Sequence, residues 1–308
     1  MFKISHKTKQ FLVLLIKILI VVGAFYFIYN QLANNDKLDW QKFIVLFRKN
    51  KSFFGISFIL FLSFLNRFLE ILKWQNLVST FKTISIGEAT KQVLAALTAG
   101  IFTPNGVGEY AGKALYFEKS ETKKIVFLNL ICNGIQLILT ILFGTIGLWI
   151  LGYDTWVWVI LLSVFVFCFL FFVLKKIKLK GYSINDFIVK INEIPKSIHQ
   201  KNIYLGIARY LTFSHQYYFL FLAFDVHLPY FILMATIATV YFLASSLPSF
   251  QFLDFAVKGS VAVYFFGILH VNEWIVIFVT TLMWSLNVVI PVAIGSFYVL
   301  KFKIKTNK

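Results

Sequence analysis

The sequence predicts an all-α polytopic membrane protein made of two inverted repeats, each with three transmembrane helices and a re-entrant hairpin of broken helices. Three observations predict this fold class. Of the 308 residues, 59% are hydrophobic and only 14% are charged, whereas soluble domains carry about 25% charged residues. The hydrophobic residues come in runs of roughly the 20 residues that cross a bilayer. Polar residues also recur in the same order in the two halves of the chain.

Six hydrophobic runs are long enough to cross a bilayer. They are residues 11–30, 53–72, 125–151, 155–174, 203–225 and 273–300. The first run follows Lys3, Lys7 and Lys9, as a signal peptide would. It is too long for such a peptide and no cleavage site of small residues follows, so we expect an uncleaved span.

Two further hydrophobic stretches are interrupted by polar residues. Residues 87–117 contain a break around Pro104, and residues 229–268 contain one around Pro248. The segments on either side of each break are barely long enough to cross a bilayer. Each stretch therefore predicts a re-entrant hairpin of two half-helices, and two short full spans are the alternative.

The distribution of Lys and Arg predicts how the chain lies in the membrane. Most of them occur on the flanks that share a side with the N-terminus. Because basic loops remain in the cytoplasm, both termini are predicted to be cytoplasmic. The basic segment 37–51 departs from this rule, and its Trp40, Phe43 and Phe47 predict an amphipathic helix on the membrane surface. Residues 183–199 predict a similar helix on the inner face.

The polar residues of the two halves correspond at an offset of about 142 to 145 residues. The corresponding pairs are Arg67 and Arg209, Pro104 and Pro248, Glu109 and Asp254, and Lys113 and Lys258. Three crossings per half make the second copy inverted, with repeat one at about 1–152 and repeat two at about 153–308. Inverted repeats with broken helices near the midplane are typical of transporters. The alternative is chance similarity between apolar segments.

Charged residues inside the spans and hairpins are the candidates for a substrate site, because a charge near the bilayer centre costs about 2.5–3.5 kcal/mol. Glu109 and Lys113 lie one helical turn apart, as do Asp254 and Lys258. Each pair is either a structural ion pair or part of a site in which the lysine meets the phosphate of a lipid headgroup. Glu70 is a further charged candidate, whereas Lys73 and Trp74 at the inner end of the second span are expected to anchor it at the membrane interface.

The arginines and the first polar break add to the predicted substrate site. Arg67 and Arg209 are each expected to pair with a hairpin acid, either as a structural contact or as a relay for an anion. Asn105, Gly106 and Gly108 precede a predicted half-helix. Their backbone N–H groups are expected to form an anion cradle.

Several functions are not supported by the sequence. It contains no Gly-x-Ser-x-Gly, HExxH or Walker motif. Cys132 and Cys168 lie in apolar runs and have no metal or disulfide spacing, so neither a metal nor another cofactor is expected. The net charge of +17 is explained by basic loops beside membrane spans rather than by nucleic-acid binding.

Motifs along nearly the whole chain resemble one known family. They are residues 103–109 with Lys113, Lys73 with Trp74, residues 247–259, and Asn287 with Pro291 and Gly295. This pattern resembles the lysylphosphatidylglycerol synthase transmembrane region family, whose members are flippase-like membrane proteins. Asn133 and Gln136 stand where that family often has an arginine and an acid, and the second motif lacks the usual glycines. Without an aminoacyl-transfer domain, the resemblance implies movement or presentation of a lipid rather than lysine transfer.

The sequence therefore predicts a lipid translocase of a bacterial inner membrane. A midplane site between the two hairpins is expected to bind the anionic headgroup of a phospholipid or a lipid-linked glycan. One alternative is a membrane-embedded transferase that acts on a lipid-linked sugar. Another is a non-catalytic partner of a lipid or glycan synthase, and a homodimer is a further possible assembly.

Overall fold

The computed structural model describes residues 53–103, 106–177, 183–247 and 253–302, together with a few isolated positions before residue 42. All regular structure within these ranges is helical. Apart from the isolated positions, several predicted features lie outside the described residues: the span 11–30, the surface helix 37–51, Pro104, Asn105 and Pro248.

Four helices in the described part of the chain are long and apolar enough to cross a membrane. They are α3 (Phe53–Val78), α6 (Thr122–Ile150) with the short 3₁₀ turn η1 (Lys119–Glu121) before it, α7 (Asp154–Leu174), and the continuous helix Glu273–Lys301. These helices confirm the long apolar segments predicted at 53–72, 125–151, 155–174 and 273–300.

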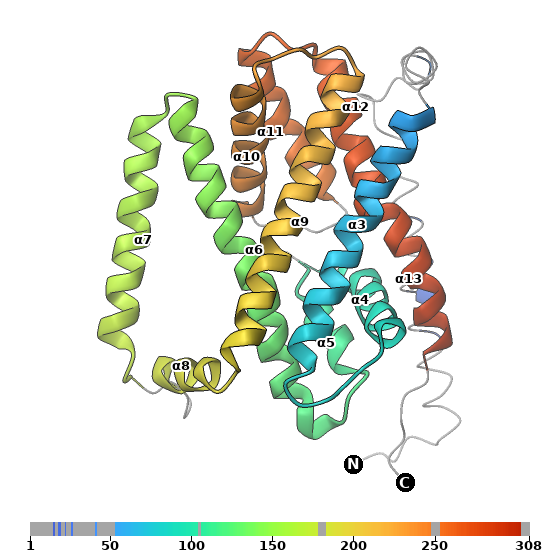
Figure 1. Ribbon diagram of the computed structural model, residues 1–308, viewed down its shortest axis with the longest axis vertical. Helices are drawn as coiled ribbons and strands as arrows, with labels where there is room; N and C mark the ends of the chain where they lie inside the picture. Colours follow the sequence, from blue (N-terminus) through green and yellow to red (C-terminus); the bar gives the residue numbers. More distant parts are fainter. Residues whose placement is uncertain are drawn as a thin grey trace.

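The predicted span 203–225 lies in α9 (Lys196–Ala223), which has a different character. At 28 residues α9 is as long as the four apolar helices, but it carries more polar residues. Figure 1 shows α9 lying alongside α3 through the middle of the molecule. Its polar side chains include Thr212, Ser214 and Gln216, which are buried between helices. Helix α9 is therefore not among the four described helices that are apolar enough to cross a membrane, and the span 203–225 stays a prediction.

The last long helix contains an irregular turn. It consists of α12 (Glu273–Trp284), a π-helical turn η3 (Ser285–Val289) and α13 (Ile290–Lys301). Pro291 follows the turn and has no N–H, so it cannot donate to the carbonyl of Asn287 four residues earlier. A π-turn of this kind often marks a functional position.

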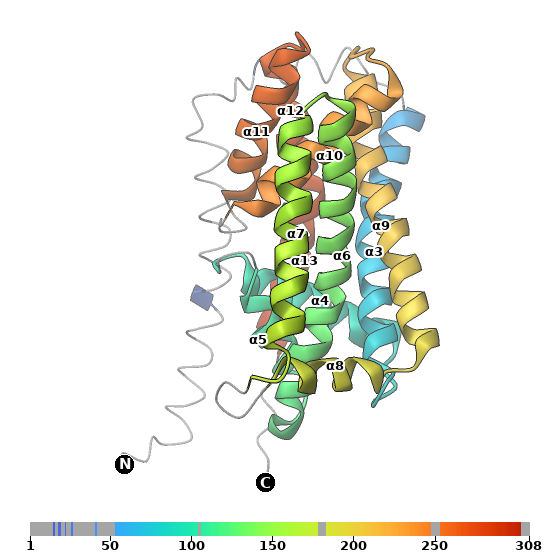
Figure 2. The ribbon, with the colours of Figure 1, turned by 90° about the vertical axis from the view of Figure 1, so that its left-hand side faces the viewer.

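Four shorter helices lie at opposite ends of the molecule. They are α4 (Ile86–Gly100), α5 (Gly108–Ala114), α10 (Tyr230–Ser246) and α11 (Asp254–Ile268). The longest, α10, has 17 residues, which extend for about 26 Å. In both views α4 and α5 lie toward the lower end and α10 and α11 toward the upper end (Figures 1 and 2).

Helices α7 and α8 form an arm beside the bundle. No residue of α7 is buried, and α7 diverges from α6 toward its lower end (Figure 1). The predicted surface helix 183–199 is represented by α8 (Ile184–Asn192), which lies across the lower ends of the long helices (Figure 2). The ring of Phe187 on α8 contacts Phe127 on α6. The chain then turns at Pro195 and enters α9.

Two clusters of buried apolar residues lie toward the two ends of the bundle. The upper cluster joins α9, α10, α11 and α12, and it includes Phe221, Ile237, Phe266 and Val279. The lower cluster joins α3, α4 and α6, and it includes Trp74, Leu77, Val93 and Leu128. The polar residues described below lie between these clusters.

Glycines allow two pairs of helices to approach closely. On α13, a Cβ added at Gly295 would lie 2.2 Å from the carbonyl oxygen of Leu94 and 2.3 Å from Oγ1 of Thr98, both on α4. Small residues at such contacts let helix backbones pack against each other in membranes. The α4–α13 contact therefore requires glycine at position 295.

The contact between α6 and α10 has the same construction. A Cβ added at Gly147 on α6 would lie 2.5 Å from the carbonyl oxygen of Ala235 and 2.8 Å from Oγ1 of Thr239. As in the α4–α13 contact, the glycine faces a backbone carbonyl and a threonine one helical turn further on.

We expect Gly295→Ala and Gly147→Ala each to destabilise the protein by about 1–3 kcal/mol, because the added methyl group forces the paired backbones apart. Gly134→Ala is the matched control on α6, since a Cβ there meets nothing within 4 Å. This control should leave stability unchanged or raise it by up to about 1 kcal/mol. Thermal unfolding of the detergent-purified proteins measures the difference, and equal stability of all three variants would contradict the close packing.

Candidate functional site

Helix α3 presents a polar face to the interior of the bundle. Asn66, Glu70 and Lys73 are spaced at i, i+4 and i+7, which places them on one side of the helix. All three are buried, and Lys73 is only 1% exposed. Trp74 is completely buried as well. The interpretation of Lys73 and Trp74 as a membrane-interface anchor is therefore wrong, because both side chains point into the protein.

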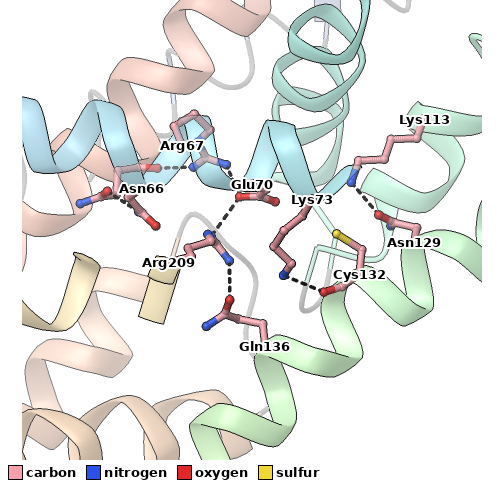
Figure 3. Close-up of polar contacts among 10 residues, drawn as sticks. Asn66, Arg67, Glu70, Lys73, Lys113, Asn129, Cys132, Gln136 and Arg209 are labelled. Atoms are coloured by element: carbon pink, nitrogen blue, oxygen red, sulfur yellow. Dashed lines mark hydrogen bonds and ion pairs between the residues drawn. The ribbon is translucent and has the colours of Figure 1, made fainter. Parts of the chain in front are cut away.

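Glu70 is the acidic centre of this region. One of its carboxylate oxygens accepts from Nη1 of Arg67 at 2.8 Å and forms an ion pair with Nη2 of Arg209 at 2.9 Å (Figure 3). The two arginines that correspond in the sequence thus come together at one carboxylate. Both lie near the middle of their helices, about 16–21 Å from either end. The acid that bridges them is on α3 itself, so neither arginine takes a hairpin acid as its ion-pair partner among the described residues, contrary to the prediction.

Arg67 also connects α3 to the irregular turn η3. Its Nη2 donates to the carbonyl oxygen of Asn287 at 2.6 Å, the carbonyl that Pro291 leaves without its α-helical donor. The side chain of Asn287 accepts from Asn66 at 2.7 Å and donates to Gln216 at 3.0 Å. Asn287 is therefore the point at which α3, α9 and η3 are joined.

Helix α6 receives two further cationic side chains. Nη1 of Arg209 donates to Oε1 of Gln136 at 3.3 Å, and Nζ of Lys73 donates to the carbonyl oxygen of Cys132 at 2.9 Å. Figure 3 shows both side chains reaching from neighbouring helices to α6. Both cations thus have neutral acceptors on α6, and the only carboxylate that Arg209 contacts among the described residues, Glu70, is shared with Arg67.

Lys113 on α5 is completely buried. Its Nζ donates to Oδ1 of Asn129 on α6 at 2.6 Å and lies 4.5 Å from the centre of the Trp74 ring, a cation–π contact. The indole N–H of Trp74 donates to Gln92 on α4 at 2.7 Å. This set of contacts joins α3, α4, α5 and α6 around the lysine.

Glu109 lies one helical turn before Lys113 and is 7% exposed. It packs against Gly100 at the end of α4, where an added Cβ would lie only 2.6 Å from its Cγ. Its carboxylate is close enough to act electrostatically on Arg67. The first hairpin sequence thus brings both of its predicted charged residues to the cluster around Glu70.

In the α4–α5 loop, the N–H groups of Gly106 and Gly108, both part of the predicted anion cradle, are already bonded within the loop. Gly106 has φ = 68°, a conformation that favours glycine. Its N–H donates to the carbonyl of Thr103, the N–H of Gly108 donates to Oγ1 of Thr103, and the N–H of Glu109 donates to the carbonyl of Gly106. These three groups are satisfied within the loop. Asn105 lies outside the described residues.

Asp254 and Lys258 lie apart from the cluster around Glu70. They form an ion pair on α11, and the ammonium lies 4.9 Å from the centre of the Tyr241 ring. Together they line a cavity of about 50 Å³, which has room for a few water molecules. Asn287 lines the same cavity. The second pair of predicted site residues is thus connected to the first through Asn287.

The buried cluster has more cations than anions. In the described part of the chain it contains the buried Lys73 and Lys113 and the largely buried Arg67 and Arg209, but only Glu70 and Glu109 as carboxylates. We call these six residues the buried charge cluster. Its positive excess favours an anion, because burying an uncompensated charge is costly.

The buried charge cluster also has N–H donors without acceptors. Among the described residues, no acceptor is present for Nε of Arg67, Nε of Arg209, Nε2 of Gln136 or Nδ2 of Asn129. The amide orientations follow from their cationic partners, which can only donate and so require the amide oxygens. An unsatisfied buried donor costs about 1–3 kcal/mol. An oxyanion, which carries only acceptors, would satisfy these donors.

The uncharged members of this region were not predicted as site residues. Asn66, Gln92, Asn129 and Gln216 each hydrogen-bond to another helix or to a cation of the cluster. The available signal was an amide side chain inside an apolar helix. Such a residue usually faces the interior of a membrane bundle, where it can hydrogen-bond to another helix.

We expect Glu70→Gln to destabilise the protein by about 3–5 kcal/mol, because two largely buried arginines then lose their shared carboxylate. Glu118→Gln, on an exposed acid before η1, is the matched control and should have no effect. Thermal unfolding in detergent measures both. If Glu70→Gln unfolds at the temperature of the control, the carboxylate does not hold the arginines together.

Three comparisons of this chain with known proteins were negative. No protein-family model, no curated protein and no solved structure matches it. The resemblance to the lysylphosphatidylglycerol synthase transmembrane region family stays a prediction, and the function must be argued from the residues of the site.

Proposed function

We propose that this protein moves an anionic lipid across a bacterial inner membrane and binds the lipid's phosphate-bearing headgroup at mid-depth. The lipid is a phospholipid or a lipid-linked glycan, which share this chemistry. The observation that carries the proposal is the excess of buried cations and unpaired N–H donors around Glu70. A phosphate brings negative charge and acceptor oxygens to donors of this kind.

The proposal includes two inverted halves, at about residues 1–152 and 153–308. The packing of helices from one half against helices of the other half supports this arrangement. Helix α3 packs against α9, while α4 packs against α13 and α10 packs against α6. Gly295 and Gly147 each face a carbonyl and a threonine on the short helix of the other half. A two-fold relation that exchanges the halves accounts for each of these pairs.

The arginine contacts follow the same exchange. Arg67 in the first half reaches Asn287 in the last long helix of the second half. Arg209 in the second half reaches Gln136 in the last long helix of the first half. Glu70 breaks the pattern, because Thr212 stands at the corresponding place in α9. A single acid between two arginines leaves the junction of the halves positively charged.

In this proposal the pairs α4–α5 and α10–α11 are re-entrant hairpins that enter from opposite faces. Their short lengths and their positions at opposite ends of the bundle support this assignment (Figure 1). Each hairpin then brings one acid and one lysine to the interior: Glu109 and Lys113 from the first, Asp254 and Lys258 from the second. The cavity beside Asp254 and Asn287 extends the polar region toward the other face.

Flipping of a fluorescent lipid in proteoliposomes tests the transport function. We expect the wild-type protein to move labelled phosphatidylglycerol and Arg209→Gln to slow this at least about tenfold, a loss of about 1.4 kcal/mol of stabilisation. Lys196→Gln, at the exposed start of α9, is the matched control and should flip at the wild-type rate. A lipid-linked sugar phosphate and labelled phosphatidylcholine are run in parallel to identify the headgroup.

Two outcomes would contradict the proposal. If folded Arg209→Gln and Lys258→Ala proteins both flip at the wild-type rate, the proposed site is wrong. If the wild-type protein flips no lipid faster than empty liposomes, transport is wrong. Conversion of a lipid-linked sugar donor to product by the pure protein would point to the transferase alternative.

We also propose that the lower end of the bundle faces the cytoplasm, because Lys and Arg gather there. Single cysteines in a Cys168→Ser background test this, since Cys132 is buried. In intact spheroplasts an impermeant maleimide should label Glu273→Cys at the upper end but not Lys119→Cys at the lower end. Labelling of Lys119→Cys before permeabilisation would reverse the orientation.

A further inference from the structure

A second cavity lies outside the buried charge cluster, where α4, α5 and α13 meet at the lower end of the bundle. Its volume is about 380 Å³. Its walls are aromatic and its rim is basic: Lys91, Tyr116, Phe297, Tyr298, Lys301 and Phe302 line it. The rings of Tyr116 and Phe302 are in edge-to-face contact with centres 4.8 Å apart. This contact joins the end of α5 to the end of α13.

The charged residues that line this cavity are all basic. Lys91 lies in the second turn of α4, and Lys301 is the last residue of α13. The Lys301 ammonium lies 4.1 Å from the centre of the Phe297 ring, which holds it at the rim. No acidic residue of the described chain lines the cavity. An anionic group between the two lysines would therefore meet positive charge from two helices.

An exposed apolar stripe leads from the cavity along α13. Ile290, Ile294 and Phe297 are spaced at i, i+4 and i+7, and Lys301 follows at i+11 on the same face. The three apolar residues are about half exposed. From Ile290 to Lys301 the helix rises by about 16 Å. One leaflet of a bilayer has a hydrocarbon thickness of about 15 Å, half of the total.

We propose that this cavity and stripe bind an anionic phospholipid from the leaflet at the lower end of the bundle. The phosphate lies between Lys91 and Lys301, and an acyl chain follows Phe297, Ile294 and Ile290 to the bilayer centre. The match between the stripe and one leaflet identifies a lipid rather than a soluble anion. This site does not depend on lipid transport, because it uses none of the residues of the buried charge cluster.

Native mass spectrometry with added lipids tests the site. The purified protein is titrated with phosphatidylglycerol or with phosphatidylcholine of the same acyl chains. We expect the wild type to retain one phosphatidylglycerol at least about fivefold better than phosphatidylcholine. Lys91→Gln/Lys301→Gln should abolish this preference. Lys119→Gln/Lys196→Gln removes two exposed lysines at the same end of the bundle and should preserve it.

The contrary outcomes are distinct from those that test transport. Retention by the Lys91→Gln/Lys301→Gln protein at the wild-type level would overturn the site, as would equal losses in both double variants. Arg209→Gln should retain the lipid; if it loses the lipid, the retained molecule belonged to the buried charge cluster. Displacement by soluble glycerol phosphate at the same concentration would show that the acyl chain plays no part.

Discussion

The arrangement of the long helices depends on the carboxylate that Arg67 and Arg209 share. Two guanidinium groups that meet near the middle of adjacent helices would repel each other, and Glu70 reverses that repulsion. Each arginine can then use its remaining donors on a third element. Arg67 donates to the turn η3, which precedes α13, and Arg209 donates to α6. Replacing a whole buried ion pair with apolar residues often changes the free energy of unfolding little. Removing only one partner lowers it strongly, because the other charge is left buried and unpaired. The bundle is thus held in register by a set of contacts that must be complete.

The same carboxylate explains why the interior of the protein suits an anion. One acid cannot neutralise two arginines, and the nearby lysines find neutral oxygens and an aromatic ring rather than further acids. Asn287 extends the polar region from this cluster to the cavity beside Asp254 and Lys258. The residues of this polar region, which the proposed transport would use, therefore come from both halves of the chain. The cavity between α4, α5 and α13 is a separate feature, because none of its lining residues belongs to the buried charge cluster.

The sequence predicted the long apolar helices well, because hydropathy depends on composition within one segment. It was less informative about α9, whose polar residues turn inward against α3. Lys73 and Trp74 were misassigned because a basic residue beside a tryptophan looks the same whether it faces headgroups or other helices. The role of Glu70 could not be predicted, since its second partner, Arg209, is far away in the sequence. The N–H groups of Gly106 and Gly108 were expected to be open, but Thr103 and the loop itself satisfy them.

Pro291 has a consequence for the evolution of this chain. It removes the helical donor to the Asn287 carbonyl, and Arg67 on α3 replaces that donor. In a membrane a carbonyl without a donor is costly, so the two positions constrain each other. A non-proline residue at 291 would restore the helical bond and relax the requirement for arginine at 67. Among homologues, positions 67 and 291 should therefore co-vary, although more than two hundred residues separate them.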